Sequence, residues 1–241
     1  MKIKSVVHSF VIVVVFVILA ISCKKDNDTN NPTPDGTITD IEGNIYHTVI
    51  IGTQTWMVEN LKTTKYNNGD AIPNITNGSA WSNLTSPGYC WYNNEVSNKN
   101  IYGALYNWYT VNTGKLCPNG WHVPSVTEFT TLINYLGGYS VAGGKMREKG
   151  YIHWAIIDGP NPNTDITNPI ATNESGFTSL PAGYRYADSN EGFFELGFYA
   201  SYWTSTLADD YPPIFDLGYY GDIGPDKGMK PEGYSVRCIK D

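Results

Sequence analysis

The segment Pro124-Ser-Val-Thr-Glu-Phe-Thr-Thr-Leu-Ile-Asn-Tyr-Leu-Gly-Gly138 carries the clearest structural pattern in the chain. Ser125 can cap the free N–H of the third helical residue while the carboxylate of Glu128 reaches back, which is the capping-box pattern. Apolar side chains then recur at helical spacing as far as the glycine pair: Phe129, Leu132, Ile133 and Leu136. The spacing predicts a helix that begins after Ser125 and ends at Gly137-Gly138.

Strand patterns lie on both sides of this helix. Upstream, the β-branched run Ile45–Ile51 and the segment Gln54–Val58 flank Gly52-Thr53, which predicts a hairpin. A second helix is expected near Gly103–Val111. Closing strands are expected near Tyr202–Thr206, Ile214–Leu217 and Tyr234–Ile239. The order of strands, two helices, long loops and closing strands predicts an α+β domain with both chain ends in one sheet.

Residues 1–22 have the pattern of a secretory signal peptide. Lys2 and Lys4 precede an almost wholly apolar run that ends in Leu-Ala-Ile-Ser-Cys23. This ending resembles the bacterial lipobox, in which cleavage occurs just before a cysteine that carries diacylglycerol. We therefore expect Cys23 to be lipidated, which makes the membrane a partner through the lipid anchor. The alternative is an uncleaved transmembrane anchor, because about 17 apolar residues lie near the lower limit for a bilayer span.

The residues after Cys23 are polar and cannot bury surface. Residues 23–36 are therefore interpreted as the lipidated cysteine and a flexible tether, followed by one domain over 37–241. Lys24 differs from the Asp that resembles an inner-membrane retention signal, and Asp26 and Asp28 are similar to export tags of surface lipoproteins. We expect a lipoprotein of the cell envelope that is anchored in the outer membrane. Exposure on the cell surface is kept as an alternative to the periplasmic side.

Composition narrows the choice of partners. Hydrophobic residues make up 41% of the chain, enough for a core, and aromatic residues 14%, with 18 Tyr and 7 Trp. Frequent turns together with Tyr, Trp, Thr and Asn favour a β-rich extracellular domain. The net charge of −7 argues against nucleic acid as a partner, because phosphates require a basic surface.

Several motifs give the domain a family resemblance. In order along the chain they closely resemble the Fibrobacter succinogenes major paralogous domain, over roughly Ile38 to Asp241. The motifs are Tyr102–Tyr109, Leu116–Pro124, Asn173–Phe177, Leu180–Arg185, Tyr202–Thr206 and Gly233–Asp241. That family consists of cell-envelope lipoproteins without an assigned reaction, so the resemblance implies a location and no chemistry.

A more distant resemblance concerns the fold. The pattern Gly-Trp-His-Val-Pro-Ser-x-x-Glu-Phe at 120–129, with the closing motif, is similar to the formylglycine-generating enzyme and C-type lectin group. It implies a C-type-lectin-like domain with paired N- and C-terminal strands, two helices and a long loop region, here Lys149–Ala200. The enzyme of that group implies a redox-active cysteine pair near the C-terminal end. Only Cys238 lies there, so we expect no such activity.

The lectin-like layout also bears on the remaining cysteines. It brings Cys117 and Cys238 together, and because thiols outside the cytoplasm tend to oxidise, the resemblance implies a disulfide between them. Cys90 lies between Tyr89 and Trp91 and is expected to be buried. The alternative is that Cys90 is the true disulfide partner.

No catalytic or metal-binding constellation is found in the sequence. The histidines at 47, 122 and 153 lack ligand spacing, and no cofactor is expected. The segment Asp158–Asp165 places oxygen ligands on alternate residues but lacks the glycine and final glutamate of an EF-hand, and turn chemistry also explains it. Calcium is kept as an alternative there, with candidate ligands Asp158, Asn161, Asn163 and Asp165.

Aromatic and polar side chains in the loop region suit sugar recognition, because ring faces stack on C–H surfaces while amides and carboxylates bind hydroxyls. The candidates are Trp154, Asn173, Glu174, Tyr184, Arg185, Tyr186 and Asp188. The alternative is that they build the loop scaffold, with Arg185 in an internal salt bridge. We expect a surface binding module for a glycan or another envelope protein. The alternatives are a structural envelope component without soluble ligand and, less favoured, a formylglycine-generating-type enzyme.

Overall fold

The computed structural model describes residues 33–155, 171–188, 192–207 and 210–241, which form an α+β fold with two five-stranded sheets. In spatial order the first sheet contains β1 (Thr33–Thr39), β2 (Ile45–Ile51), β3 (Gln54–Met57), β12 (Ile239–Lys240) and β6 (Trp121–His122). The predicted hairpin is β2–β3, and the strands near both chain ends share this sheet, as expected. β1 already begins at Thr33, so residues 33–36, which were expected to belong to the tether, are in the sheet.

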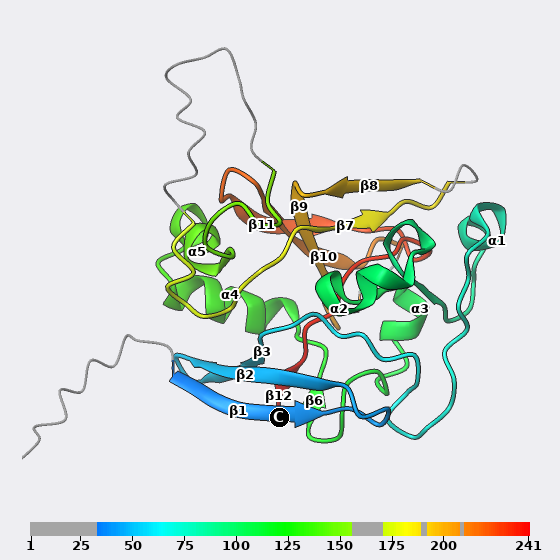
Figure 1. The fold of residues 1–241 in the computed structure, drawn as a ribbon, viewed down its shortest axis with the longest axis horizontal. Coiled ribbons are helices and arrows are strands. Elements are labelled where there is room, and N and C mark those ends of the chain that lie inside the picture. The colour runs from blue at the N-terminus through cyan, green and yellow to red at the C-terminus, as the bar shows by residue number, and fades with distance from the viewer. Residues whose placement is uncertain (1–32, 156–170, 189–191, 208–209) are drawn as a thin grey trace, which may run out of the picture.

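The second sheet is formed by the C-terminal third of the chain. In spatial order it contains β11 (Ile223–Lys227), β10 (Pro213–Gly218), β9 (Tyr199–Trp203), β7 (Ala182–Arg185) and β8 (Phe193–Leu196). β7 and β9 are parallel, and the other neighbours are antiparallel. Figure 1 shows the two sheets on opposite sides of the molecule. The region 149–200 was expected to be mainly loop, but it contains β7, β8 and the start of β9.

The predicted capped helix is α4 (Val126–Tyr135). The side chain of Ser125 accepts from the backbone N–H of Glu128, whose own carboxylate accepts from the backbone N–H of Ser125. The glycine pair does end this helix, but a second helix that was not expected, α5 (Tyr139–Met146), starts directly after it. Both helices lie on one side of the sheets in Figure 1. None of the helices in the described part of the chain has the length and apolar character of a membrane span.

The second helix expected near Gly103–Val111 is much shorter than predicted. Leu105 lies in a strand, and a helix starts only at Trp108 because the side chain of Asn107 caps the N–H of Thr110. The short elements of this region are α1 (Gly78–Ser82), β4 (Tyr89–Cys90), η1 (Tyr92–Asn94), η2 (Val96–Asn98), α2 (Lys99–Tyr102), β5 (Leu105–Tyr106) and α3 (Trp108–Val111). They cover the side of the sheets opposite to α4 and α5 (Figure 1).

Aromatic side chains fill the space between α4 and the sheets. Phe129 of α4 stacks on Phe215 of β10 at 4.8 Å between ring centroids and contacts Trp56 of β3 at 5.1 Å. All three side chains are buried. Full burial of a side chain of this size stabilises a fold by roughly 2–3 kcal/mol, so α4 is held by both sheets.

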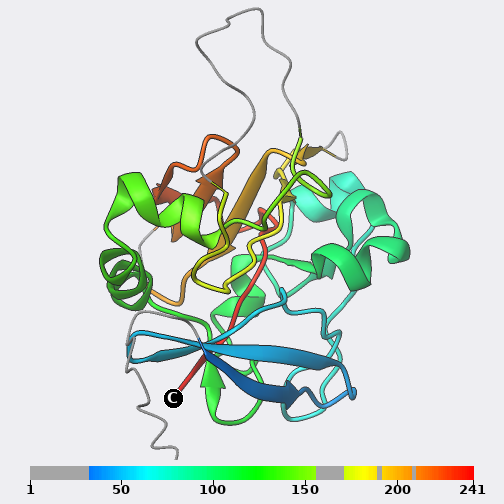
Figure 2. The same ribbon diagram turned by 60° about the vertical axis from the view of Figure 1, so that its left-hand side comes forward.

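The C-terminal segment connects the two sheets. Gly233 bridges to Arg185 of β7, and Ser235 bridges to Tyr202 of β9. A few residues later, the carbonyl of Cys238 accepts from Met57, and Ile239 pairs with Trp56 of β3. Figures 1 and 2 both show this segment, in red, running from the second sheet to the first. We call residues 232–240 the closing segment.

A disulfide fastens the closing segment. Cys117 and Cys238 are bonded, with 6.0 Å between their Cα atoms and a sequence separation of 121, which confirms the expected pair. Cys90 is a free thiol and is buried, as expected. The alternative in which Cys90 takes part in the disulfide is therefore wrong.

The first prediction concerns the free energy of unfolding. Loop-closure entropy for a disulfide that spans about 120 residues is worth about 5 kcal/mol. The double variant Cys117→Ser/Cys238→Ser should lose most of this amount in denaturant unfolding followed by tryptophan fluorescence. Wild-type protein in reductant should show the same loss. A loss below about 1 kcal/mol in both experiments would contradict the assigned role.

His122 links the start of α4 to the end of the chain. Its Nδ1 lies 2.6 Å from Asp241 Oδ1, and its Nε2 lies 2.8 Å from Glu128 Oε1. Burial by itself lowers the pKa of His122, but the hydrogen bonds to the two carboxylates outweigh this effect and raise the pKa above its ordinary value. The protonated imidazole is thus favoured in the folded protein.

The second prediction follows from this pKa shift. Because the pKa is higher in the folded chain than in the unfolded one, His122 stabilises the fold fully below about pH 6.5, and the contribution disappears as pH rises through the folded-state pKa. Relative to His122→Gln, the wild-type protein should lose free energy of unfolding as the pH rises above about 6.5. Denaturant titrations at several pH values measure this difference, and a difference independent of pH would refute the expectation.

Candidate functional site

A cavity of about 560 Å³ that combines aromatic rings and charged groups lies on the second sheet. Its walls come from strands β7 to β11 and from residues 229–234 of the chain. Its tyrosines are Tyr184, Tyr186, Tyr199, Tyr211 and Tyr234. Its charged residues are Glu195, Asp216, Asp226, Lys227 and Glu232. We call this cavity the tyrosine–carboxylate pocket.

Strand alternation explains why a carboxylate lies on the floor of this pocket. On β10, Phe215 and Leu217 belong to the core next to α4, so the side chain between them, that of Asp216, points to the other face. Asp216 lies directly opposite Ser201 of the neighbouring strand β9. Ile214 precedes it on the same face and lines the pocket as well.

Two carboxylates of the pocket have unusual surroundings. Burial raises the pKa of Asp216 to about 6, although Ser201 partly opposes the shift. Its Oδ1 is buried and has no hydrogen-bond partner among the described residues. Glu232 is only 3% exposed, and its Oε2 accepts from Met229 N at 2.7 Å and from Tyr234 Oη at 2.8 Å. Burial still raises the pKa of Glu232 above its usual value.

A continuous series of ring contacts forms the aromatic wall of the pocket. It starts at Tyr186, which is 41% exposed, and passes through Phe194 to Tyr184, with ring centroids 6.4 Å and 6.0 Å apart. Tyr184 then contacts Tyr234 at 5.6 Å, and Tyr234 contacts the buried Trp203 at 4.8 Å. The exposed rings are therefore braced against the core, which makes the wall a pre-formed surface.

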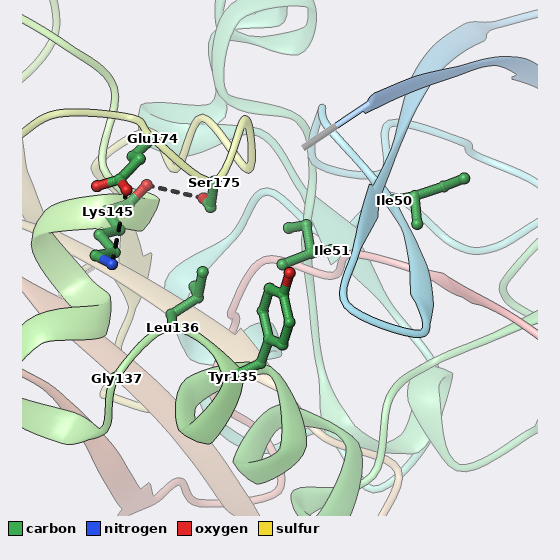
Figure 3. A pocket seen from close by; sticks show the side chains of 8 residues that line it. All are labelled: Ile50, Ile51, Tyr135, Leu136, Gly137, Lys145, Glu174 and Ser175. Carbon is green, nitrogen blue, oxygen red and sulfur yellow. Dashed lines mark hydrogen bonds and ion pairs between the residues drawn. The ribbon is translucent and has the colours of Figure 1, made fainter. Parts of the chain in front are cut away.

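A smaller cavity of about 250 Å³ lies where α4 ends (Figure 3). Ile51 and Leu136 supply apolar surface, while Lys145, Glu174 and Ser175 supply polar groups. These polar groups already bind one another, because Lys145 Nζ lies 3.7 Å from Glu174 Oε1 and the hydroxyl of Ser175 donates to the carbonyl of Lys145 at 2.8 Å. This cavity therefore offers fewer unused polar atoms than the tyrosine–carboxylate pocket.

Comparison with known families gives the relationship of the chain. Residues 49–240 match the Fibrobacter succinogenes major domain. The chain belongs to this family. The match covers most of the chain and includes the motifs on which the resemblance was based. No curated protein and no solved structure matches the chain.

In this Fibrobacter succinogenes major domain, the expected ligand-binding residues do not form a single site. Tyr184 and Tyr186 line the tyrosine–carboxylate pocket, whereas Glu174 lines the smaller cavity. Asn173 binds within its own loop, where its side chain donates to Thr178 Oγ1 and accepts from Thr178 N, each at 2.9 Å. Asp188 Oδ1 accepts from Gly192 N at 3.3 Å.

Two of the residues that were expected to bind the ligand are instead buried in the interior. Trp154 is 1% exposed, and its Nε1 donates to the carbonyl of Ser179 at 3.1 Å. Arg185 is fully buried and donates to the carbonyls of Ile75 and Thr76 at 2.7 Å and 2.9 Å. Both side chains are thus scaffold. Among the described residues Arg185 has no carboxylate within ion-pair distance, and its hydrogen-bond partners are carbonyl oxygens.

The free cysteine, Cys90, lacks the properties of a nucleophile. Burial raises the pKa of the Cys90 thiol to about 12, and the neighbouring Arg185 opposes this only in part. A thiol with so high a pKa is protonated at neutral pH and does not react as a thiolate. Cys117 and Cys238 are bonded to each other, so neither supplies a free thiol.

The two carboxylates that distinguish the pocket were not predicted from the sequence. Asp216 is the one polar side chain within Ile214–Leu217, a strand that was expected, so alternation along that strand indicated a polar floor position. Glu232 comes just before the closing motif, and no local pattern identifies it. The calcium candidates Asp158, Asn161, Asn163 and Asp165 lie outside the described residues.

Proposed function

We propose that this protein is an envelope lipoprotein whose domain binds a glycan in the tyrosine–carboxylate pocket. The observation that carries the proposal is the combination, in one cavity, of braced tyrosine rings, several carboxylates and one buried carboxylate oxygen, Asp216 Oδ1, that has no hydrogen-bond partner among the described residues. Sugar rings present C–H faces that stack on aromatic rings, and their hydroxyls donate to carboxylates. Tyr184 and Tyr186 supply the first kind of contact, and Asp216 and Glu232 supply the second.

The size of the pocket favours a glycan over an envelope protein as the occupant. Pockets for small ligands usually enclose about 300–1,000 Å³, and the tyrosine–carboxylate pocket has about 560 Å³. A stable protein partner would instead need about 800 Å² of contact surface on each side. A concave site of this volume suits one or two sugar units.

The proposal includes a C-type-lectin-like arrangement of the domain. It is supported by the pairing of β3 with the closing strand β12 and by the disulfide between Cys117 and Cys238, the residue directly before this strand. In such an arrangement the loops after the helices carry the ligand. Tyr184 in β7 and Tyr186 just after it also follow the helices in the chain.

The location in the cell envelope rests on the N-terminal sequence. Cleavage before Cys23 and acylation of its thiol would attach the domain to the outer membrane through the polar residues that follow. More than one acyl chain gives stable anchoring, whereas a single chain does not.

The third prediction tests the anchor. In a bacterial host that processes lipoproteins, the full chain should incorporate labelled palmitate and remain in the membrane fraction, whereas Cys23→Ser should do neither. The control variant Cys90→Ser retains the thiol at position 23 and should still be labelled. Mass spectrometry that found an unmodified sulfur on Cys23, or an uncut leader, would exclude the anchor.

The fourth prediction tests the pocket. The purified full chain in detergent should bind members of a glycan array, and Tyr186→Ala should reduce the affinity about tenfold, because a lost stacking contact is worth about 1 kcal/mol or more. Tyr139→Ala is the matched control, since Tyr139 is 42% exposed, as Tyr186 is 41% exposed, but lies on α5. Binding is followed by calorimetry.

Two results would count against glycan binding. One is an empty array. The other is equal binding by Tyr186→Ala and the wild-type protein. An empty array together with cross-linking in cells to one fixed partner would instead favour a structural envelope component.

A further inference from the structure

We infer that the tyrosine–carboxylate pocket selects a glycan that carries a free amine, such as a hexosamine unit without an N-acetyl group. This inference rests on the proposed function, because it specifies the ligand of the same site. The reason is that the pocket presents buried acceptors and negative charge that a neutral sugar satisfies only in part.

The charge of the lining is strongly one-sided. Of the charged groups that line the pocket, four are carboxylates and one is the ammonium of Lys227. Lys227 is exposed on the rim, as are Asp226 and Glu195, whereas Asp216 and Glu232 are on the floor. A uronic acid or a sulfated sugar would meet like charge at this floor, which disfavours acidic glycans. A cationic group would meet opposite charge.

Asp216 is the group whose position most requires a cationic partner. A buried carboxylate oxygen without a hydrogen bond is costly in free energy, because it has lost water and gained nothing in return. An ammonium group can donate a hydrogen bond to it and also neutralise its charge. A hydroxyl can do only the first, so an amine should gain more from the same place. Burial raises the pKa of Asp216 to about 6, although the hydrogen bond with Ser201 opposes part of the shift.

Glu232 and the tyrosines provide the other contacts that an ammonium group needs. Glu232 is only 3% exposed, and the hydrogen bonds that it accepts from Met229 and Tyr234 both go to Oε2. Oε1 accepts no hydrogen bond from the described residues, which leaves it for a ligand. Tyr184 and Tyr234 line the same cavity, and the faces of such rings attract cations.

An organic cation fits this geometry better than a metal ion does. In the ranges that the structure describes, no three side chains of His, Cys, Asp or Glu converge as metal ligands. The carboxylates of the pocket come from different strands and from the closing segment, so they are distributed over the walls. An ammonium group attached to a sugar ring can reach one or two of them while the ring stacks on tyrosine.

The test compares two ligands that differ only in the amine. The full chain in detergent, in EDTA at pH 7, is titrated by calorimetry with a β-1,4-linked glucosamine oligomer and with its fully N-acetylated counterpart. We expect the amine form to bind at least about tenfold more tightly. Asp216→Asn should remove most of this difference, weakening the amine form about tenfold and changing the acetylated form less than about twofold. Glu95→Gln removes one negative charge from the surface outside the pocket and should change neither.

A pH series adds an independent measurement. Lowering the pH from about 7 to about 5 protonates Asp216, so the advantage of the wild-type protein over Asp216→Asn in binding the amine form should shrink over this range. Protonation of the amine affects both proteins alike and cancels in this comparison. Glu232→Gln serves as a second variant if Asp216→Asn does not fold, and it should also reduce the preference for the amine.

The outcomes separate this inference from the proposed function. Equal binding of both oligomers, or binding that is lost in EDTA and restored by Ca²⁺, would overturn the amine preference and leave glycan binding in place. Failure of both oligomers while other glycans on the array bind would do the same. Failure of every glycan would overturn both.

Discussion

The closing segment is the constraint on which the rest of the structure depends, and Arg237 is its central contact. The Arg237 guanidinium donates to Asn60 Oδ1 and to the carbonyl of Thr178, each at 2.9 Å, and to the carbonyl of Phe177. It lies 4.2 Å from the centre of the Phe177 ring. One side chain therefore joins the end of the chain, the segment after β3 and the loop before β7. The pocket floor at Glu232 begins the same segment, so its geometry depends on this junction.

Two other buried arginines make the same kind of contact as Arg237. Arg147, Arg185 and Arg237 are all buried, each donates to backbone carbonyls, and each lies over an aromatic ring, with Trp154 and Trp81 in contact with the first two. In the described ranges none of them forms an ion pair with a carboxylate. Carbonyl dipoles and ring faces offset part of the cost of burying the charge. Each guanidinium thereby fixes loop backbone that has no regular strand to hold it.

Local patterns were sufficient for some of this fold and insufficient for the rest. The cap at Ser125 and the hairpin after Ile45 depend on neighbours in sequence, so they were predictable. α5 was not predicted because a Gly-Gly pair normally ends a helix. In addition, Gly143 is a glycine within the helix because of a close contact with a distant part of the chain, which no local pattern reveals. A Cβ there would lie 2.1 Å from the carbonyl oxygen of Gly221. The disulfide followed from the family resemblance and not from local pattern.

The site was less predictable than the fold for the same physical reason. Tyr184 and Tyr186 were identified because aromatic residues on polar loops are visible in the sequence. Asp216 and Glu232 meet only after β10 has paired with β9 and the closing segment has docked, and these are contacts between distant parts of the chain. Arg185 looked like a ligand-binding residue for a related reason, since nothing nearby in sequence reveals the carbonyls that bury it.

The choice of carbonyl oxygens as partners for the interior cations has a consequence for the response to acid. Carbonyls and aromatic rings do not titrate, and even Arg147, whose pKa burial lowers to about 10, stays charged at and below neutral pH. Ion pairs with carboxylates would be broken by protonation, but these contacts have no proton to gain. These three junctions are therefore insensitive to acid, and a fall in pH leaves the contacts that the guanidinium groups make with the loop backbone unchanged.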